Sequence, residues 1–222
     1  MSKCKRDERL INQPCSGDCI TFRIKLGTDY MAKTPVGNIP IELGWEERRY
    51  LYYNPGRLIG TATTSTDGTC EISFKAKQEE LTKGNYYIKL FHSDEYHNKD
   101  FQYSYYIKKS DTTVDTRIHL ISKANLKVIF KDFDPKVSND NFNVFARFKI
   151  AFPKDYGSYS VLPYGGFSFT TGAFSTKELS GVTAGNDYTY ITVNRRINGV
   201  TTQVEDSLYI AKGETKTYTV SY

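Results

Sequence analysis

Apolar and polar residues alternate along much of the chain, with the two-residue period of β-strands that bury one face. The clearest segment is residues 20–26, Ile-Thr-Phe-Arg-Ile-Lys-Leu, which ends at the turn-forming Gly27-Thr28-Asp29. One helix-like turn interrupts the pattern at residues 77–81. The first half of the chain is therefore expected to be all-β, with strands at residues 20–26, 35–43, 45–53, 59–64, 70–75, 85–91, 101–108 and 111–116.

The second half of the chain continues the alternation after a boundary near residues 121–123. Its strongest local signal is Asn198-Gly199, a pair typical of tight hairpin turns. Strands are predicted at residues 126–131, 143–152, 193–196, 200–204 and 213–222, with a turn-rich connection at 132–141. We therefore expect two tandem β-sandwich domains, residues 19–120 and 121–222, after an N-terminal tether of residues 1–18.

The composition agrees with an all-β fold, and the charge distribution argues against a nucleic-acid partner. The 222 residues include 18 Tyr and 13 Phe but only 2 Met, and aromatic residues suit a pleated, half-buried surface. The net charge of +5 is spread over intermixed acids and bases, without the basic stripe of a nucleic-acid groove. No apolar run is long enough to cross a bilayer, so attachment to a membrane would need lipid or a partner.

Three motifs follow one another in the first half of the chain: residues 35–43, the hairpin 61–70 around Asp67-Gly68, and the strand entry Gly84-Asn85-Tyr86. Together they resemble the carboxypeptidase-regulatory-like, or transthyretin-like, β-sandwich family over residues 18–118. Ser65 and Cys70 depart from that family, which usually has Asp and a core aromatic residue there. The resemblance implies that Tyr86 plugs one end of a sandwich and that the protein has an adhesion, tethering or accessory role. For residues 121–222 we expect an immunoglobulin-like sandwich or another transthyretin-like copy.

The N-terminus carries a second resemblance. Cys4 is followed by Lys5-Arg6-Asp7-Glu8 and then by polar, turn-prone residues. This resembles the start of a mature surface lipoprotein of bacteroidetes-type bacteria, in which the cysteine sulfur is acylated. The resemblance implies lipidation of Cys4 and a place on the outer face of the outer membrane, with residues 1–3 as a remnant. The alternative is that Cys4 is an ordinary thiol in a frayed terminus.

The sequence allows two disulfide pairings for Cys19. Cys15 and Cys19 are close enough to close a small loop, whose backbone Gly17 relieves. Alternatively, Cys19 at the head of the first strand reaches Cys70 across the first sandwich. A zinc site is not expected, because no second Cys or His pair completes a tetrahedral ligand set.

Catalytic signatures are missing from the sequence, and we therefore predict a non-enzymatic protein without cofactor or metal. Only three histidines are present, and His92 and His97 are five positions apart, so they face opposite sides of a strand and point apart on a helix. The acids Asp132, Asp134 and Asp140 lack the spacing of a calcium loop. The adjacent carboxylates Glu46-Glu47 and Glu79-Glu80 are expected to be solvated.

Aromatic residues are the more informative candidates for a contact surface. A Gly/Tyr/Ser-rich stretch has the composition of recognition loops, because tyrosine gives a large contact area at low entropy cost. The alternative is that these rings cap the open end of a sandwich. The predicted contacts with a protein partner or a glycan are Trp45, Tyr156, Tyr159, Tyr164 and Phe167.

These features together favour a lipid-anchored protein of the outer-membrane surface. Its expected role is that of an accessory or binding subunit of an outer-membrane protein complex for transport, secretion or barrel assembly. Two alternatives remain, a glycan-binding protein of a polysaccharide-uptake system and an adhesin or fimbrial component that polymerises through its terminal strand. No nucleic-acid partner is expected.

Overall fold

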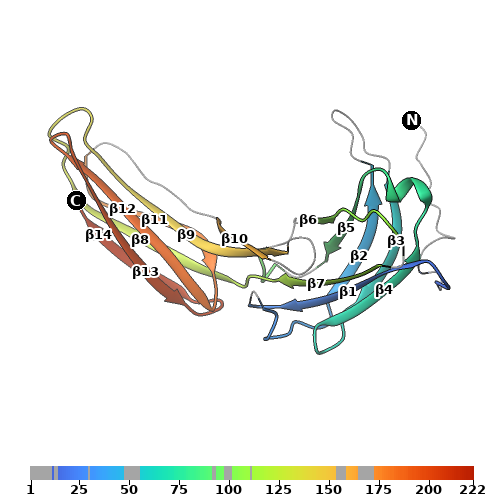
Figure 1. The fold of residues 1–222 in the computed structure, drawn as a ribbon. Helices are drawn as coiled ribbons and strands as arrows, with labels where there is room; N and C mark the ends of the chain where they lie inside the picture. The colour runs from blue at the N-terminus through green and yellow to red at the C-terminus, as the bar shows by residue number, and fades with distance from the viewer. Residues whose placement is uncertain are drawn as a thin grey trace, which may run out of the picture. The chain divides into compact units, whose positions relative to one another are not determined.

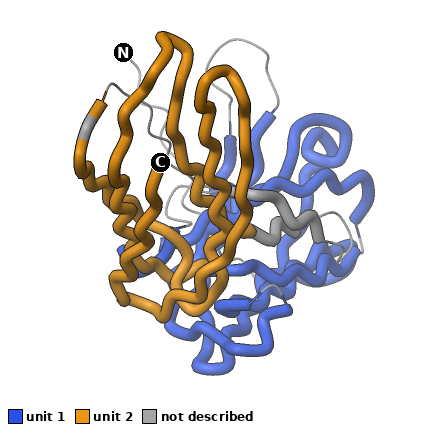
Figure 2. Tube along the Cα trace, turned by 90° about the vertical axis from the view of Figure 1, so that its left-hand side faces the viewer, with its two compact units in different colours: residues 1–120, 151–160 blue, residues 121–150, 161–222 orange. Residues whose placement is uncertain are grey.

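The structure is a computed structural model of the chain, shown as a ribbon in Figure 1. The residues that it describes are 12, 15–29, 31–47, 56–91, 94–97, 102–110, 112–153, 159–164 and 173–222, without the side chains of 150–153, 159–164 and 174. The chain divides into two compact units, coloured separately in Figure 2. Unit 1 is Met1–Leu120 with Ala151–Ser160, and unit 2 is Ile121–Ile150 with Val161–Tyr222.

The strands up to residue 119 form two sheets that enclose one core. The three-stranded sheet has the order β4-β1-β7, and the four-stranded sheet has the order β3-β2-β5-β6. A short 3-10 turn, η2 (Gln78–Leu81), follows β4. The strands are β1 (Cys19–Gly27), β2 (Pro40–Glu46), β3 (Gly56–Thr63), β4 (Thr69–Lys75), β5 (Asn85–Leu90), β6 (Gln102–Tyr105) and β7 (Thr112–His119).

The strands from residue 123 onward form a second pair of sheets. Their orders are β11-β8-β14 and β10-β9-β12-β13. The strands are β8 (Lys123–Phe133), β9 (Asn141–Pro153), β10 (Tyr159–Tyr164), β11 (Phe174–Ala184), β12 (Asp187–Ile197), β13 (Val200–Ile210) and β14 (Thr215–Ser221). The chain is therefore all-β, as the alternation predicts.

The second set of strands repeats the topology of the first. In each three-stranded sheet the first strand is central, antiparallel to the fourth strand and parallel to the last. In each four-stranded sheet the second strand lies between the third and the fifth. An immunoglobulin domain has its first strand at the edge of a sheet, so the order in unit 2 is not the immunoglobulin one. The topology agrees with the other expectation for residues 121–222, a second copy of the first sandwich.

The core of unit 1 is built on alternate residues of β1. Ile20, Phe22, Ile24 and Leu26 are buried, whereas Arg23 between them is exposed. The Phe22 ring lies 5.4 Å from the ring of Tyr105 in an edge-to-face arrangement and 6.3 Å from that of Phe74. Aromatic pairs of this kind add to the free energy gained by burial.

The core of unit 2 has a corresponding aromatic centre. Phe130 packs edge-to-face on Phe142 at 5.2 Å between ring centroids, and Phe133 packs on the C-terminal Tyr222 at 4.6 Å. The Tyr222 hydroxyl donates to the Arg196 carbonyl at 2.8 Å. The last residue of the chain is therefore part of the packing of unit 2.

Most predicted strands of unit 1 are confirmed, and the main error is in the second. The prediction started that strand at Pro35, but Pro35 forms only an isolated bridge with Gly27, and β2 begins at Pro40. Asn38 has a positive φ of 61°, which interrupts an extended strand. Residues 48–55, where the next predicted strand ends, lie outside the described residues. In the second half of the chain, β10 and β11 are strands that the alternation does not predict.

Two turns contain a glycine with a positive φ angle. Asn198 and Gly199 have φ values of 50° and 81°, as the predicted tight hairpin between β12 and β13 requires. Gly68 has a φ of 77°, and a Cβ atom there would lie 2.5 Å from the Leu26 carbonyl oxygen. The Gly68 carbonyl accepts a hydrogen bond from the Leu26 N–H at 2.8 Å, so this turn packs directly on β1.

The described part of the predicted tether belongs to the fold. The Asn12 N–H donates to the Ile59 carbonyl at 3.1 Å, and the Asn12 side-chain oxygen accepts from the Thr61 N–H at 2.7 Å. A Cβ atom on Gly60 would lie 2.6 Å from that oxygen, so glycine permits this close approach. The expectation of a tether extending to residue 18 is therefore wrong, because Asn12 is hydrogen-bonded to the edge of β3.

The structure joins Cys15 to Cys19 in a disulfide, and Cys70 is a free thiol. The alternative pairing of Cys19 with Cys70 is not formed. In the β1–β4 register Cys70 is opposite Ile24, whereas Cys19 is opposite Lys75. The two sulfurs are thus separated by five positions along the strand, about 16 Å, which exceeds the reach of a disulfide. Burial raises the pKa of the Cys70 thiol to about 11.

We predict that alkylation of the native protein without reductant modifies neither Cys15 nor Cys19. Cys70 reacts slowly at pH 7 and faster as the pH rises toward its pKa of about 11, because only the thiolate is nucleophilic. Peptide mapping by mass spectrometry after alkylation at several pH values measures both. A Cys70→Ser variant, as control, keeps the Cys15–Cys19 peptide. A peptide in which Cys19 is joined to Cys70 contradicts the assignment.

Candidate functional site

The candidate metal and catalytic residues do not converge among the described residues. No group of three His, Cys, Asp or Glu side chains is placed to hold a metal ion in that part of the chain. The His119 ring nitrogen Nε2 is 3.1 Å from the Thr28 carbonyl oxygen. Asp134 pairs with Lys136, while the Asp140 carboxylate accepts from the backbone of the same loop at 2.9 Å. His92 lies outside the described residues.

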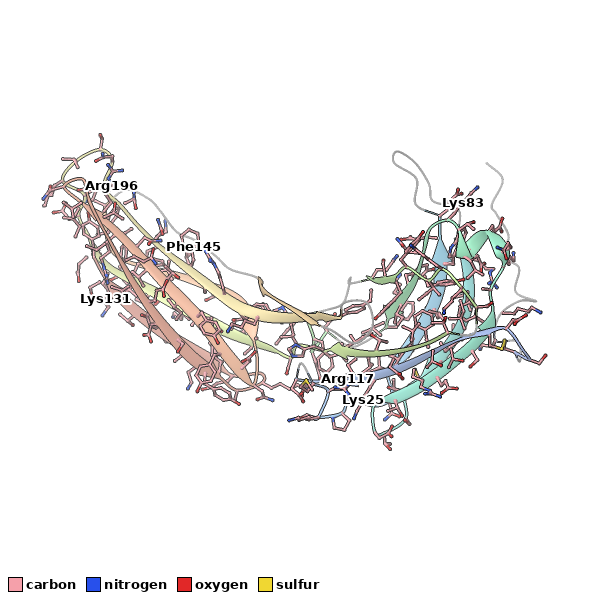
Figure 3. All side chains as sticks on the ribbon, in the orientation of Figure 1. Lys25, Lys83, Arg117, Lys131, Phe145 and Arg196 are labelled. Carbon is pink, nitrogen blue, oxygen red and sulfur yellow. A yellow bond between two sulfur atoms is a disulfide. The ribbon has the colours of Figure 1, made fainter. Side chains whose placement is uncertain are left out.

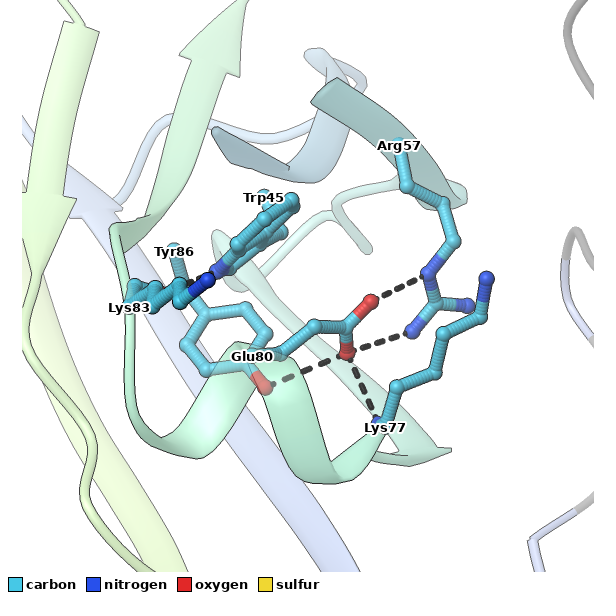
Figure 4. A network of polar contacts seen from close by, with 6 residues as sticks. All are labelled: Trp45, Arg57, Lys77, Glu80, Lys83 and Tyr86. Atoms are coloured by element: carbon cyan, nitrogen blue, oxygen red, sulfur yellow. Dashed lines mark hydrogen bonds and ion pairs between the residues drawn. The ribbon is translucent and has the colours of Figure 1, made fainter. Parts of the chain in front are cut away.

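The most polar buried cluster is a structural one at the end of unit 1 (Figure 4). Arg57 on β3 makes a bidentate contact with Glu80 of η2, with distances of 2.6 and 2.8 Å. The carboxylate also accepts from the Lys77 N–H at 3.0 Å. The Glu80 side chain is 1% exposed, so the prediction that Glu79-Glu80 are both solvated is wrong for Glu80. The 3-10 turn directs this carboxylate inward, where an arginine fork satisfies it.

Two aromatic residues complete this end of the sandwich (Figure 4). Tyr86 is fully buried, and its hydroxyl donates to Glu80 at 3.4 Å. Burial and the Glu80 charge raise the pKa of Tyr86. Trp45 is also buried, and its indole N–H donates to the Lys83 carbonyl at 3.0 Å. The prediction that Trp45 contacts a partner or glycan is therefore wrong, because its ring packs in the core.

We predict that Arg57→Leu lowers the free energy of unfolding by roughly 3 kcal/mol, because it leaves a buried carboxylate without its cation. The control is Arg23→Leu, which removes an ion pair with Glu71 in which both side chains are exposed, and it costs less than about 1 kcal/mol. Urea denaturation followed by circular dichroism measures both. The double variant Arg57→Leu/Glu80→Leu recovers part of the loss, since no charge is then buried. Equal losses of unfolding free energy for Arg57→Leu and Arg23→Leu would show that the buried ion pair stabilises the fold no more than the exposed one.

The other predicted contact residues cannot be placed as side chains. Tyr156 and Phe167 lie outside the described residues. Tyr159 and Tyr164 begin and end β10, next to β9 in the four-stranded sheet, but their side chains lie outside the described part. Their role in binding stays a prediction.

A different aromatic surface is present on the outer face of the same sheet. We call it the tyrosine face, and it combines side chains of three adjacent strands. The β-sheet register aligns Tyr190 of β12 with Arg147 of β9, and Tyr188 of β12 with Tyr209 of β13. Its members are Phe145, Arg147 and Lys149 on β9, Tyr188 and Tyr190 on β12, and Tyr209 on β13. Figure 3 labels Phe145 on β9.

The rings and cations of the tyrosine face touch one another. The rings of Tyr188 and Tyr209 are 5.5 Å apart in an edge-to-face arrangement. The Lys149 ammonium lies 4.6 Å from the centre of the Tyr190 ring, and the Arg147 guanidinium lies 5.4 Å from that of Phe145. A shallow hollow of about 240 Å³ is lined by Arg147, Lys149 and Tyr190 on one side and by Glu205 and Asp206 on the other.

The alternation of β12 departs from what hydrophobicity would give at one position, Thr189, which is buried while the larger tyrosines on either side of it are exposed. Tyr188 and Tyr190 are 49% and 40% exposed, while Thr189 and Ile191 between and beyond them are 0% and 1% exposed. The Thr189 hydroxyl is satisfied by that of Thr183 at 2.6 Å, so the smaller and more polar residue occupies the interior. The sequence contains the signal, two tyrosines two positions apart on a strand, but periodicity does not say which face is covered.

Two further hollows lie in unit 1. One, of about 600 Å³, is on the outer face of β4-β1-β7 and is lined mainly by charged residues such as Lys25 and Arg117, both labelled in Figure 3. The other, of about 410 Å³, lies between β3 and β4 beside Asn12. Neither contains an exposed aromatic ring.

Comparison with known proteins gives fold neighbours only. No protein-family model and no curated protein matches the chain. The resemblances noted in the sequence therefore stay predictions. Among the described residues, no helix has the length and apolar character needed to span a bilayer.

Several solved structures align with most of the chain. The Bacillus anthracis TIE protein is 13% identical with a TM-score of 0.37, and the alignment covers 91% of this chain and 34% of that one. A streptococcal ancillary pilin is 13% identical with a TM-score of 0.34, covering 91% and 64%. The minor pilin of Streptococcus agalactiae is 12% identical with a TM-score of 0.33, covering 92% and 95%. The chain thus spans about a third of the first protein and under two thirds of the second.

Proposed function

We propose that this chain is a non-enzymatic protein of a bacterial cell surface, an adhesin or fimbrial component, which binds its ligand through the tyrosine face of unit 2. The observation that carries the proposal is the exposure of Tyr188, Tyr190 and Tyr209, at 49%, 40% and 46%. These rings contribute little to the core, because their strands bury the alternate residues instead. Large exposed aromatic residues gathered on one face mark a binding surface.

The geometry of the sheet suits such a surface. Side chains on adjacent strands are held at fixed spacing by the backbone ladder, so the rings are placed before a ligand arrives. Preorganised side chains lose less entropy on binding than those of a mobile loop. The repeated sandwich of unit 1 then acts as a spacer or as a second contact module.

Attachment to the cell is proposed from the sequence alone. Cys4 lies outside the described residues, so lipidation, an outer-membrane location and a partner complex in that membrane rest on the resemblance of the N-terminus. We predict that mass spectrometry of protein from its native host detects an N-terminal peptide that starts at acylated Cys4. An unmodified Cys4 preceded by residues 1–3 would contradict the lipid anchor without affecting the tyrosine face.

The adhesin proposal predicts that the purified, fluorescently labelled protein adheres to at least one of three surfaces: bacterial cells, wells coated with polysaccharide and wells coated with extracellular-matrix protein. The triple variant Tyr188→Ala/Tyr190→Ala/Tyr209→Ala loses adherence at least tenfold, because it removes the exposed rings. It keeps its circular dichroism spectrum, since the core is unchanged.

The matched control for this experiment is Tyr106→Ala. Tyr106 belongs to unit 1 and is 46% exposed, about as much as each of the three tyrosines, so its removal takes away one comparable ring at another place. The control variant adheres like the unmodified protein. Adherence that is equal in the triple variant and the unmodified protein, or absent from all three surfaces, would refute the proposed function.

A further inference from the structure

The chemistry of the tyrosine face indicates a ligand class, and this inference rests on the proposed function above. The face has two kinds of group along β9, the ring of Phe145 followed by the cations Arg147 and Lys149. Arg147 and Lys149 are about 7 Å apart along the strand, since side chains on one face repeat every second residue. Tyr190 and Tyr188 lie on the neighbouring strand beside them.

The cations are available to a ligand. Both are exposed, and among the residues that the structure describes neither has a carboxylate within ion-pair distance. Each instead lies over an aromatic ring, Arg147 over Phe145 and Lys149 over Tyr190. A cation–π contact at an exposed site is worth only about 0.5–1 kcal/mol, so an anionic ligand can recruit these groups.

The rings match the faces of sugar units. A pyranose ring presents C–H groups of slight positive charge, and the face of a tyrosine ring is negative. Next to the aromatic residues lies a row of amides, in which the Asn194 side-chain N–H donates to the Asn143 side-chain oxygen at 3.1 Å, with Gln203 opposite Asn194 in the register. Amide groups donate and accept hydrogen bonds, as sugar hydroxyls require.

The size of the hollow agrees with one sugar ring of a longer chain. Its volume of about 240 Å³ is below the roughly 300–1,000 Å³ of pockets that enclose whole small molecules. The remaining units of a polymer would then lie along the open face, over the other rings. A glycan that crosses the strands therefore uses both the hollow and the exposed tyrosines.

The charge of the face selects an acidic glycan. Arg147, Lys149 and Arg196 lie on this side of the sheet with Glu205, which accepts from Gln203 at 3.0 Å. Asp206 also lines the hollow, but it is opposite the buried Ile191 in the register and is hydrogen-bonded to Tyr218. A nucleic acid carries a phosphate at every nucleotide and needs a denser basic groove than this. A polysaccharide with a carboxylate on every second sugar matches a surface with few cations. Its uncharged sugars can then stack on the aromatic rings.

We infer that the tyrosine face binds an acidic polysaccharide, with uronic-acid carboxylates on Arg147 and Lys149 and sugar rings stacked on Tyr190 and its neighbours. The test uses the full chain in native affinity gels that contain hyaluronan, with gels that contain dextran as the neutral comparison. The protein is retarded by hyaluronan and not by dextran, and the retardation weakens as salt rises, because carboxylate contacts are screened.

Single-residue variants test which side chains contact hyaluronan. Arg147→Gln and Tyr190→Ala each weaken binding to hyaluronan at least tenfold. Arg117→Gln is the matched control, because it removes an exposed cation from unit 1 and changes the net charge equally. It leaves binding within twofold. Isothermal titration with hyaluronan oligosaccharides gives the same ranking.

Each other result overturns the inference in a distinct way. Equal retardation by dextran shows a neutral-glycan surface, and competition by oligothymidylate shows a nucleic-acid surface. Binding that Arg147→Gln and Arg117→Gln weaken alike shows only a non-specific charge effect. If hyaluronan does not bind but adherence still needs the three tyrosines, the ligand class is wrong and the proposed function stands. If adherence is also unaffected, the proposed function fails as well.

Discussion

The parallel pairing of the first strand with the last is the constraint on which each unit of this protein depends. In unit 1 the ladder runs from Ile20 opposite Thr112 to Gly27 opposite His119, and in unit 2 from Thr215 opposite Asn125 to Ser221 opposite Lys131. Parallel neighbours need a crossover, and here the five strands between them form it. Such non-local contacts are characteristic of slow-folding all-β domains.

That arrangement also decides where a binding surface can form. A sheet in a two-layer sandwich covers one face with the core and leaves the other to solvent. In β12 the covered face holds Thr189 and Ile191, so the tyrosines are on the open side. The surface is thus a consequence of register, and its rigidity comes from the ladders to β9 and β13.

At the end of unit 1 polar residues are buried, in contrast to the exposed tyrosines of unit 2. Glu80 is buried with Arg57, Tyr86 and the backbone of Lys77, and each group satisfies another. A network of this kind is stable only when it is complete, because any unpaired member would keep its desolvation cost. It closes the sandwich where strand pairing ends, beside the hollow of about 410 Å³ that Arg57 and Lys77 help to line. A dense polar cluster is therefore a structural element here, and the exposed aromatic residues are the better indication of function.

The sequence by itself determined the all-β class, most strand positions and the tight turns, because period-two alternation and pairs such as Asn198-Gly199 act within a few residues. It also placed Tyr86 at the end of a sandwich. Only the tertiary structure decided that Trp45 is buried and Tyr190 exposed, that Glu80 turns inward, that Cys19 pairs with Cys15, and that unit 2 repeats the order of unit 1. Alternation defines two faces of a strand but leaves open which one is covered. That choice depends on pairing between residues far apart in the chain, and local sequence does not encode it.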